Sequence, residues 1–381
     1  MALGLVAAAC GSDSASGGDD AAVADDAGSS DGGSDGGSTE GVAGSLADCP
    51  NPIVIQTDWF PESEHGAVYN LTGGEGSVDP ESGRFSGPLS ADPSITVEVR
   101  AGGPFLGDQT TIAVMATDPD ILLGYVNTDE AINNYADFPT TAVFAPLDIN
   151  PQIIMFDPET YPISSWDEVK ETGAVIAHFG GATYTEYLVG AGIVDAGQLD
   201  GSYDGAPTRF IAEGGALMQQ GFATQEPYNY ENVFTEWGKP VDFLLIHDAG
   251  FEIYQGPLTI LDSKLDENRS CLSALVPVLQ QSAVDFQNDP AATNAAILQA
   301  VTDIDSFWQL TPDGMTNTVS EMTRLNMVGN GPNSTIGDFD MDRVSEVIKV
   351  VQEQVPSINV PEGITAEDLV TNEFIDESIG L

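Results

Sequence analysis

The feature that most constrains the fold of this chain is a short apolar strand that runs into a helix at residues 53–71. The stretch reads I-V-I-Q-T-D-W-F-P-E-S-E-H-G-A-V-Y-N-L, and its first residues are β-branched and apolar, which is typical of a short buried strand. The segment after Pro61 can begin a helix. In open α/β sheets, the turn from a strand into a helix lies at the carboxyl edge of the sheet, where ligands bind. The stretch therefore predicts an α/β fold with a binding site at this turn.

The turn carries side chains that are suited to binding. Asp58, Trp59 and Phe60 follow the strand directly, and His65 and Tyr69 come next. Because His65 and Tyr69 are four residues apart, a helix places them on one face, where both can face the same cleft. We therefore expect Asp58, Trp59, His65 and Tyr69 to bind a ligand. The alternative is that Trp59 belongs to the core and His65 is an ordinary surface residue.

The pattern D-W-F-P-x-x-x-H-x-x-x-Y resembles the start of the substrate-binding proteins of bacterial ABC importers. The resemblance is to the group that carries pyrimidine precursors of thiamine, with sulfonate, nitrate and riboflavin binders as relatives. It implies that Trp59 stacks on a flat heterocycle while His65 and Tyr69 hydrogen-bond its edge, in an apolar pocket with few polar groups. The chain departs from the pattern at Glu62, where the family often has Asn, and in a long acidic insertion after Thr72.

The charge of the chain excludes some classes of partner. It has 10 Lys and Arg residues against 60 Asp and Glu residues, a formal net charge of -50. Recognition of phosphate groups needs a cationic surface, so we expect neither nucleic acid nor an anionic membrane surface as a partner. No stretch after the N-terminus approaches 18 uninterrupted apolar residues, which predicts no transmembrane helix.

The N-terminal residues resemble an export signal. Cys10 follows L-V-A-A-A and resembles the lipid-bearing cysteine of a lipoprotein signal, here residues 1–10; a chance Ala-rich start is the alternative. Residues 11–48 are mostly Gly, Ser, Ala and Asp, which predicts a disordered linker. Export would place Cys49 and Cys271 in an oxidising compartment, where we expect them to form a disulfide.

Alternation of strands and helices after residue 50 predicts an α/β class with two lobes. We expect the first lobe to contain residues 49–145 and 250–381, and the second to contain residues 146–249. Two crossovers, near residues 145–151 and 246–250, would form a hinge between them. This outline resembles the type II periplasmic-binding-protein fold, with a helical C-terminal part after residue 254.

The second lobe contributes a small-residue turn between a predicted strand and a predicted helix. Small side chains allow a ligand to approach backbone N–H groups, and the helix dipole favours an anionic group there. A tight turn without a ligand is the alternative. The candidate residues at this turn are Gly180, Gly181, Ala182, Thr183 and Tyr184.

A second segment of this lobe reads G-G-A-L-M-Q-Q-G, and E-P-Y follows it. It resembles the helix that precedes an E-P-Y segment in the second lobe of the family, and it predicts a helix near residues 215–220. In a cleft, Glu226 would select a cationic or NH-bearing ligand; as a helix cap or hinge ion pair it would be structural, and the sequence leaves both open. Further candidates for ligand hydrogen bonds are Asn127, Thr128, Tyr228 and Tyr254.

Catalytic and metal-binding signals are weak in this sequence. The chain has three histidines and lacks the motifs of zinc proteases, serine hydrolases and paired-cysteine sites, so we expect neither an enzyme nor a cofactor. Asp338, Asp340 and Asp342 do not fit the calcium loop of an EF-hand, and we expect them to begin the last helix.

Together these observations predict a monomeric, lipid-anchored solute-binding protein on the outer face of the cytoplasmic membrane. It would bind a small molecule between its lobes and deliver it to the membrane subunits of an ABC permease. The first ligand class is a planar nitrogen heterocycle such as a pyrimidine precursor; a sulfonate or other organic anion is second and a riboflavin-like flavin third. A secreted enzyme and a surface scaffold protein are the alternatives from other classes.

Overall fold

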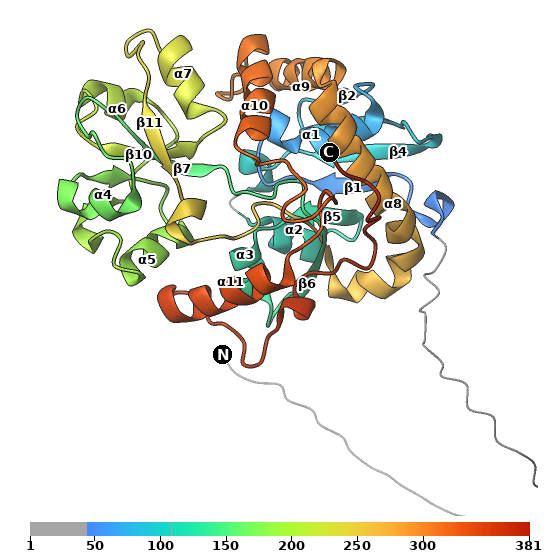
Figure 1. Ribbon diagram of the computed structural model, residues 1–381. Helices are drawn as coiled ribbons and strands as arrows, with labels where there is room; N and C mark the ends of the chain where they lie inside the picture. The colour runs from blue at the N-terminus through green and yellow to red at the C-terminus, as the bar shows by residue number, and fades with distance from the viewer. Residues whose placement is uncertain (1–43, 108) are drawn as a thin grey trace, which may run out of the picture. The chain divides into compact units, whose positions relative to one another are not determined.

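The computed structural model describes residues 44–381 except residue 108 (Figure 1). Cys10 and the predicted linker up to residue 43 lie outside the described residues. Part of the expected linker belongs to the folded unit, because a 3-10 turn, η1 (Leu46–Asp48), lies against the long helix α8 (Asp262–Asn288). The hydroxyl of Ser270 donates to Asp48 at 2.6 Å. The linker boundary that we expected at residue 48 is therefore too late. One residue further, Cys49 and Cys271 form a disulfide.

The first sheet has seven strands in the order β2-β3-β4-β1-β5-β12-β6. β1 lies parallel to both β4 and β5, and β12 lies antiparallel between β5 and β6. The acidic insertion forms β2 and β3, which extend the sheet as antiparallel strands beside β4. The bounds are β1 (Ile53–Gln56), β2 (Ser77–Asp79), β3 (Arg84–Leu89), β4 (Asp92–Arg100), β5 (Ile121–Tyr125), β6 (Thr140–Phe144) and β12 (Leu258–Leu261).

The second sheet has five strands in the order β11-β7-β10-β8-β9. β7 lies antiparallel to both of its neighbours, while β10, β8 and β9 are parallel. In each sheet, the first strand after a crossover from the other sheet thus runs antiparallel to both of its neighbours. The bounds are β7 (Gln152–Phe156), β8 (Ile176–Ala177), β9 (Leu199–Asp200), β10 (Met218–Phe222) and β11 (Asp242–Leu245).

Two predictions of secondary structure were wrong. The helix expected near residues 215–220 is absent: residues 215–217 are a turn and an irregular segment, and residues 218–220 belong to strand β10. Gly214 and Gly215 have φ values of 64° and 74°. Two consecutive left-handed residues end the preceding helix and turn the chain into the sheet. The region after residue 254, expected to be helical, begins with β12, a four-residue apolar strand too short to show a periodicity.

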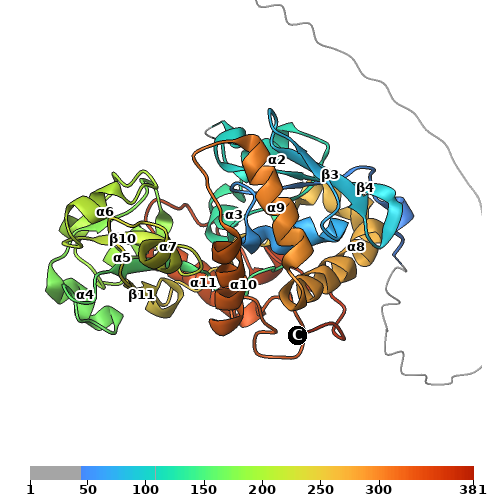
Figure 2. The same cartoon turned by 90° about the horizontal axis from the view of Figure 1, so that it is seen from above.

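Helices cover both sheets (Figures 1 and 2). In the described residues, no helix combines the length and apolar character needed to cross a lipid bilayer. The α-helices not yet given are α1 (Gly66–Tyr69), α2 (Thr111–Thr117), α3 (Thr128–Asn134), α4 (Trp166–Thr172), α5 (Thr183–Gly190), α6 (Thr208–Ala212), α7 (Glu226–Asn232), α9 (Ala291–Ile304), α10 (Pro312–Arg324) and α11 (Met341–Gln354). The remaining 3-10 turns are Ser63–His65, Asn70–Thr72, Gly103–Leu106, Ala196–Gln198, His247–Ala249 and Ala366–Asp368.

We call the seven-stranded sheet with its helices the first lobe and the five-stranded sheet with its helices the second lobe. The strands of the second lobe all fall within residues 146–249, which is compatible with the expected division. The C-terminal part departs from it, because α11 packs against both α3 of the first lobe and α5 of the second. The backbone N–H of Ser357 also donates to Glu186 of α5 at 3.0 Å. Residues 341–357 therefore contact both lobes.

The beginning of α11 agrees with the sequence. Asp340 is its N-cap, and its carboxylate accepts from the backbone N–H groups of Asp342 at 3.0 Å and Arg343 at 3.1 Å. The prediction that these aspartates begin the last helix is confirmed for Asp340 and Asp342, whereas Asp338 lies before the N-cap and accepts from the side-chain amide of Asn333 at 2.6 Å.

Candidate ligand-binding site

The turn after β1 is held by backbone contacts with the end of β4. The N–H of Gly102 donates to the Trp59 carbonyl at 2.7 Å, and the N–H of Gly103 donates to the Asp58 carbonyl at 2.9 Å. A Cβ atom at Gly102 would lie 2.3 Å from the carbonyl carbon of Asp58, so only glycine permits this approach. The hydroxyl of Thr57 donates to the Trp59 carbonyl at 2.8 Å. These contacts fix the direction in which Asp58 and Trp59 project.

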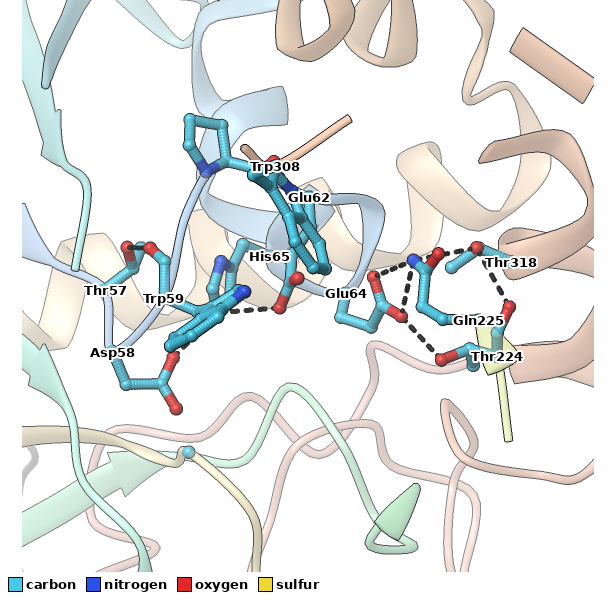
Figure 3. A network of polar contacts seen from close by, with 12 residues as sticks. Thr57, Asp58, Trp59, Glu62, Glu64, His65, Thr224, Gln225, Trp308 and Thr318 are labelled. Atoms are coloured by element: carbon cyan, nitrogen blue, oxygen red, sulfur yellow. Dashed lines mark hydrogen bonds and ion pairs between the residues drawn. The ribbon is translucent and has the colours of Figure 1, made fainter. Parts of the chain in front are cut away.

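Trp59 lies against a second tryptophan that comes from the C-terminal part of the chain (Figure 3). The ring centroids of Trp59 and Trp308 are 5.9 Å apart and the rings meet edge to face. Trp308 also lies parallel to the buried ring of Phe60 at 6.2 Å, and its indole N–H donates to the carbonyl of Pro61 at 3.3 Å. The partly exposed Trp59 and Trp308 thus form an aromatic surface at the turn.

His65 and Tyr69 do not share the role that the sequence suggested. His65 lies in the 3-10 turn Ser63–His65, and its Nε2 is 2.9 Å from Oδ1 of Asp58. Its ring contacts that of Tyr125, with centroids 4.7 Å apart. Tyr69 is fully buried, and its ring packs on Phe85 at 5.3 Å. The structure therefore places Tyr69 in the core behind the turn rather than beside Trp59, while His65 orients Asp58.

Carboxyl groups gather around this turn from both lobes. Glu62 comes from the first lobe, and burial, together with the charges of Glu64, Asp58 and Glu226, raises its pKa well above the usual range. Burial raises the pKa of Glu226, in the second lobe, to about 7, and the charge of Glu64 adds to this effect. Burial and the neighbouring charges of Asp129 and Asp58 raise the pKa of Glu130 to about 7. The site is thus a poorly solvated and strongly acidic region.

Two carboxylates connect the lobes directly. Glu64 of the first lobe accepts from the hydroxyl of Thr224 at 2.5 Å and from the side-chain amide of Gln225 at 3.1 Å, both in the second lobe (Figure 3). The carboxylate of Asp129, at the beginning of α3, accepts from the hydroxyl of Thr183, at the beginning of α5. These contacts bring the turn after β1 and the second lobe together.

The small-residue turn of the second lobe lies at this junction. Gly180 and Gly181 are exposed, and Thr183 is half-buried against Asp129. Tyr184 is buried, and its hydroxyl donates to the side-chain carbonyl of Gln220 at 2.9 Å. The turn also includes Ala182. Of the residues predicted at this turn, Thr183 is the one whose side chain hydrogen-bonds to the first lobe.

Three predicted residues use their side chains elsewhere. The side-chain oxygen of Asn127 accepts from the N–H of Gly256 at 2.8 Å, and the hydroxyl of Thr128 accepts from the N–H of Tyr254 at 3.1 Å. These bonds join the end of β5 to the segment before β12. Tyr228 lies beside Gly314 of α10, where an added Cβ would be 3.4 Å from its ring. We therefore assign packing roles to Asn127, Thr128 and Tyr228.

Tyr254 lies beside a cavity of about 210 Å³ at the crossovers. Its hydroxyl accepts from the N–H of Asp340 at 2.8 Å, and the guanidinium of Arg343 lies 3.8 Å from its ring centroid. Arg343 pairs with Asp148 at 3.0 Å. Tyr254 thus belongs to a cluster that joins the crossovers to α11, and not to the group around Trp59. The cavity is lined by Ala145, Asp148, Tyr254, Gly329, Asn330, Gly331, Pro332, Asn333, Gly337, Asp338, Phe339 and Asp340.

The sequence did not reveal several residues of the site. Trp308, Tyr125 and Asp129 are far in sequence from the turn, and no motif marks them. Glu62 and Glu64 lie at x positions of the pattern D-W-F-P-x-x-x-H. The sequence therefore showed that both residues are acidic, but not where their side chains point.

The sequence matches no protein-family model and no curated protein sequence. Its fold is similar to that of several solved structures. The periplasmic aliphatic sulphonate binding protein of Escherichia coli is 12% identical, with a TM-score of 0.55 over 84% of this chain and 96% of that one. The ligand binding component of an ABC-type import system from Staphylococcus aureus, solved with zinc bound, is 15% identical, with a TM-score of 0.52 over 86% and 100%. An ABC transporter protein from Parabacteroides distasonis is 13% identical, with a TM-score of 0.50 over 86% and 100%.

These similarities confirm the predicted fold class. The chain has the two-lobed α/β fold found in the binding components of ABC importers.

Proposed function

We propose that this protein is the solute-binding component of an ABC importer, and that it captures a small planar organic molecule between its lobes. The observation that carries the proposal is the pair Trp59 and Trp308, held beside the contacts Glu64–Thr224 and Asp129–Thr183 that join the lobes. A ligand that contacts both lobes would stabilise their closed arrangement, which a permease can recognise. Binding energy, rather than bond making, is then the mechanism.

Further parts of the proposal follow from the sequence. We propose that Cys10 carries a lipid that anchors the protein outside the cytoplasmic membrane, that the protein is monomeric, and that membrane subunits of an ABC permease receive the solute. For the ligand, a planar nitrogen heterocycle such as a pyrimidine precursor suits the two indole rings. Sulfonates, which the similar Escherichia coli protein binds according to its name, are the comparison class.

The experiment is thermal unfolding of the full chain with pyrimidines, flavins and sulfonates. A ligand at 100 times its dissociation constant stabilises the folded protein by about 2.7 kcal/mol. We expect one class to raise the unfolding temperature and Trp59→Ala to abolish the increase. Trp237→Ala is the matched control, because Trp237 packs on Phe210 in the second lobe; it should lower stability and leave the ligand-induced increase intact. If no solute alters unfolding, the proposed function is wrong.

A further inference from the structure

Carboxyl groups of both lobes surround the turn after β1: Asp58 and Glu62 both lie near Nε2 of His65, Glu64 accepts from Thr224 of the second lobe, and Glu226 accepts from the N–H of Phe222 at 2.6 Å. The charge of Glu226 in the second lobe adds to those of Asp58 and Glu64 in raising the pKa of Glu62. In the described residues, the ion pairs of lysine and arginine all involve other carboxylates. The basic side chain that contacts this acidic group in the described part of the chain is His65, whose Nε2 lies 2.9 Å from Asp58 and 3.7 Å from Glu62, and no lysine or arginine there pairs with it.

Among the described residues, several buried polar atoms near this turn, Nδ1 of His65 included, have no hydrogen-bond partner, and two of them are acceptors that a ligand could use. The hydroxyl of Tyr125, whose residue is 3% exposed, makes no hydrogen bond, and the charges of Asp58 and Glu62 both act on it. Oδ1 of Asp129, whose residue is 5% exposed, is also unpaired. Buried polar atoms in folded proteins are nearly always paired with protein, water or ligand. Both atoms are thus available to accept hydrogen bonds from a ligand.

The aromatic part of the site suits the same kind of ligand. Trp59 and Trp308 are both partly exposed, and the face of an indole ring attracts a cation. Within residues 44–381, apart from residue 108, no three His, Cys, Asp or Glu side chains are arranged to hold a metal ion. Aromatic rings, carboxylates and unpaired acceptors together match an organic cation that donates N–H hydrogen bonds.

We propose that the ligand is a planar organic cation about the size of one ring, with its charged N–H end among Asp58, Glu62 and Glu226 and its ring against Trp59 and Trp308. This inference rests on the proposed function, that the cleft captures a solute. The overall charge of -50 would also concentrate cations near the protein and repel anions.

Three probes of the same shape and different charge test the inference. Benzamidinium is a planar cation, benzamide is its neutral counterpart and benzoate is its anionic counterpart. Binding to the full chain is measured by calorimetry and by tryptophan fluorescence. We expect the dissociation constant of benzamidinium to be at least tenfold lower than that of benzamide, and no binding of benzoate.

Charge variants connect this selectivity to the carboxylates. Glu226→Gln keeps the shape of the side chain and removes its charge, so we expect at least tenfold weaker binding of benzamidinium with little change for benzamide. Glu362→Gln is the matched control, because it removes the same charge at an exposed position; it should leave both affinities unchanged. Thermal unfolding of each variant verifies that the protein is folded.

The outcomes separate this inference from the proposed function. If benzamide or benzoate binds as tightly as benzamidinium, and Trp59→Ala abolishes that binding, the cation inference is overturned and the proposed function stands. Binding of Ca²⁺ or Zn²⁺ without binding of benzamidinium also overturns the cation inference. If none of the three probes binds and no solute of the wider panel alters unfolding, both are overturned.

Discussion

Removal of the carboxylate of Glu64 should weaken the closed arrangement of the two lobes. Glu64 is 7% exposed and accepts hydrogen bonds from Thr224 at 2.5 Å and Gln225 at 3.1 Å. Gln225 has a second acceptor in the hydroxyl of Thr318 at 3.2 Å, whereas the bond to Glu64 is the one that the buried hydroxyl of Thr224 donates. The substitution Glu64→Ala would therefore leave the Thr224 hydroxyl without an acceptor in the closed arrangement.

The magnitude follows from the type of bond. A hydrogen bond to a charged group contributes about 1.5–3 kcal/mol. Because the bond joins the two lobes, its loss would act on the equilibrium between open and closed forms. That energy corresponds to a change of roughly 10–150-fold in the ratio of the two forms. The apparent affinity for any ligand of the closed form would fall by up to the same factor.

Small-angle scattering and hydrogen exchange can measure this effect. We expect Glu64→Ala to increase the radius of gyration of the ligand-free protein and to speed amide exchange in α7. Glu64→Gln keeps a side-chain carbonyl for Thr224 and should have a smaller effect, and Glu362→Ala at the surface should have none. Wild-type scattering and wild-type exchange in Glu64→Ala would refute the argument that this contact holds the lobes together.

Two further predictions concern pH and the crossovers. Burial raises the pKa of Glu226 from 4.5 to about 7, with the charge of Glu64 adding to it, so the folded protein keeps a proton that the unfolded chain has released between these values. The free energy of unfolding should therefore fall as pH rises from about 4.5 to about 7, and thermal unfolding should show a smaller fall in Glu226→Gln. Arg343→Ala removes the partner of Asp148 and the cation over the Tyr254 ring, and should lower the free energy of unfolding in urea by about 2–4 kcal/mol. A loss below about 0.5 kcal/mol, the usual range for surface positions, would contradict this.

The sequence predicted the fold better than the site. The strand at residues 53–56, the turn that follows it and the two crossovers were visible because apolar runs and small-residue turns are local signals. Helix spacing misled the prediction for Tyr69, because His65 lies in a 3-10 turn with about three residues per turn, so the 3.6-residue period does not connect the two. Trp308 is adjacent to Trp59 only through the packing of α9 and α10, which no local pattern encodes.

Strand β10 shows why polar composition can conceal a buried strand. Gln219 and Gln220 are both buried, yet each has a hydrogen-bond partner: Gln219 pairs with Tyr230 at 3.0 Å, and Gln220 accepts from Tyr184 at 2.9 Å. The pairing allows amide side chains inside the second lobe. A hydrophobicity pattern records only that these residues are polar, and it contains no information about their distant tyrosine partners.

The contact between Asp129 and Thr183 bears on the charge of the proposed ligand. From the sequence, the turn at residues 180–183 was expected to offer the beginning of the following helix to an anion, or to be a tight turn without a ligand. In the structure, Thr183 instead donates its hydroxyl to a carboxylate of the first lobe, and burial raises the pKa of Asp129. An anionic ligand at this position would have to displace Asp129 or lie beside it, at a cost in electrostatic energy that a cation does not incur. A fold does not determine what its binding site accepts, so under the proposed function we expect the acidic residues of this chain, rather than its fold, to decide the charge of the ligand.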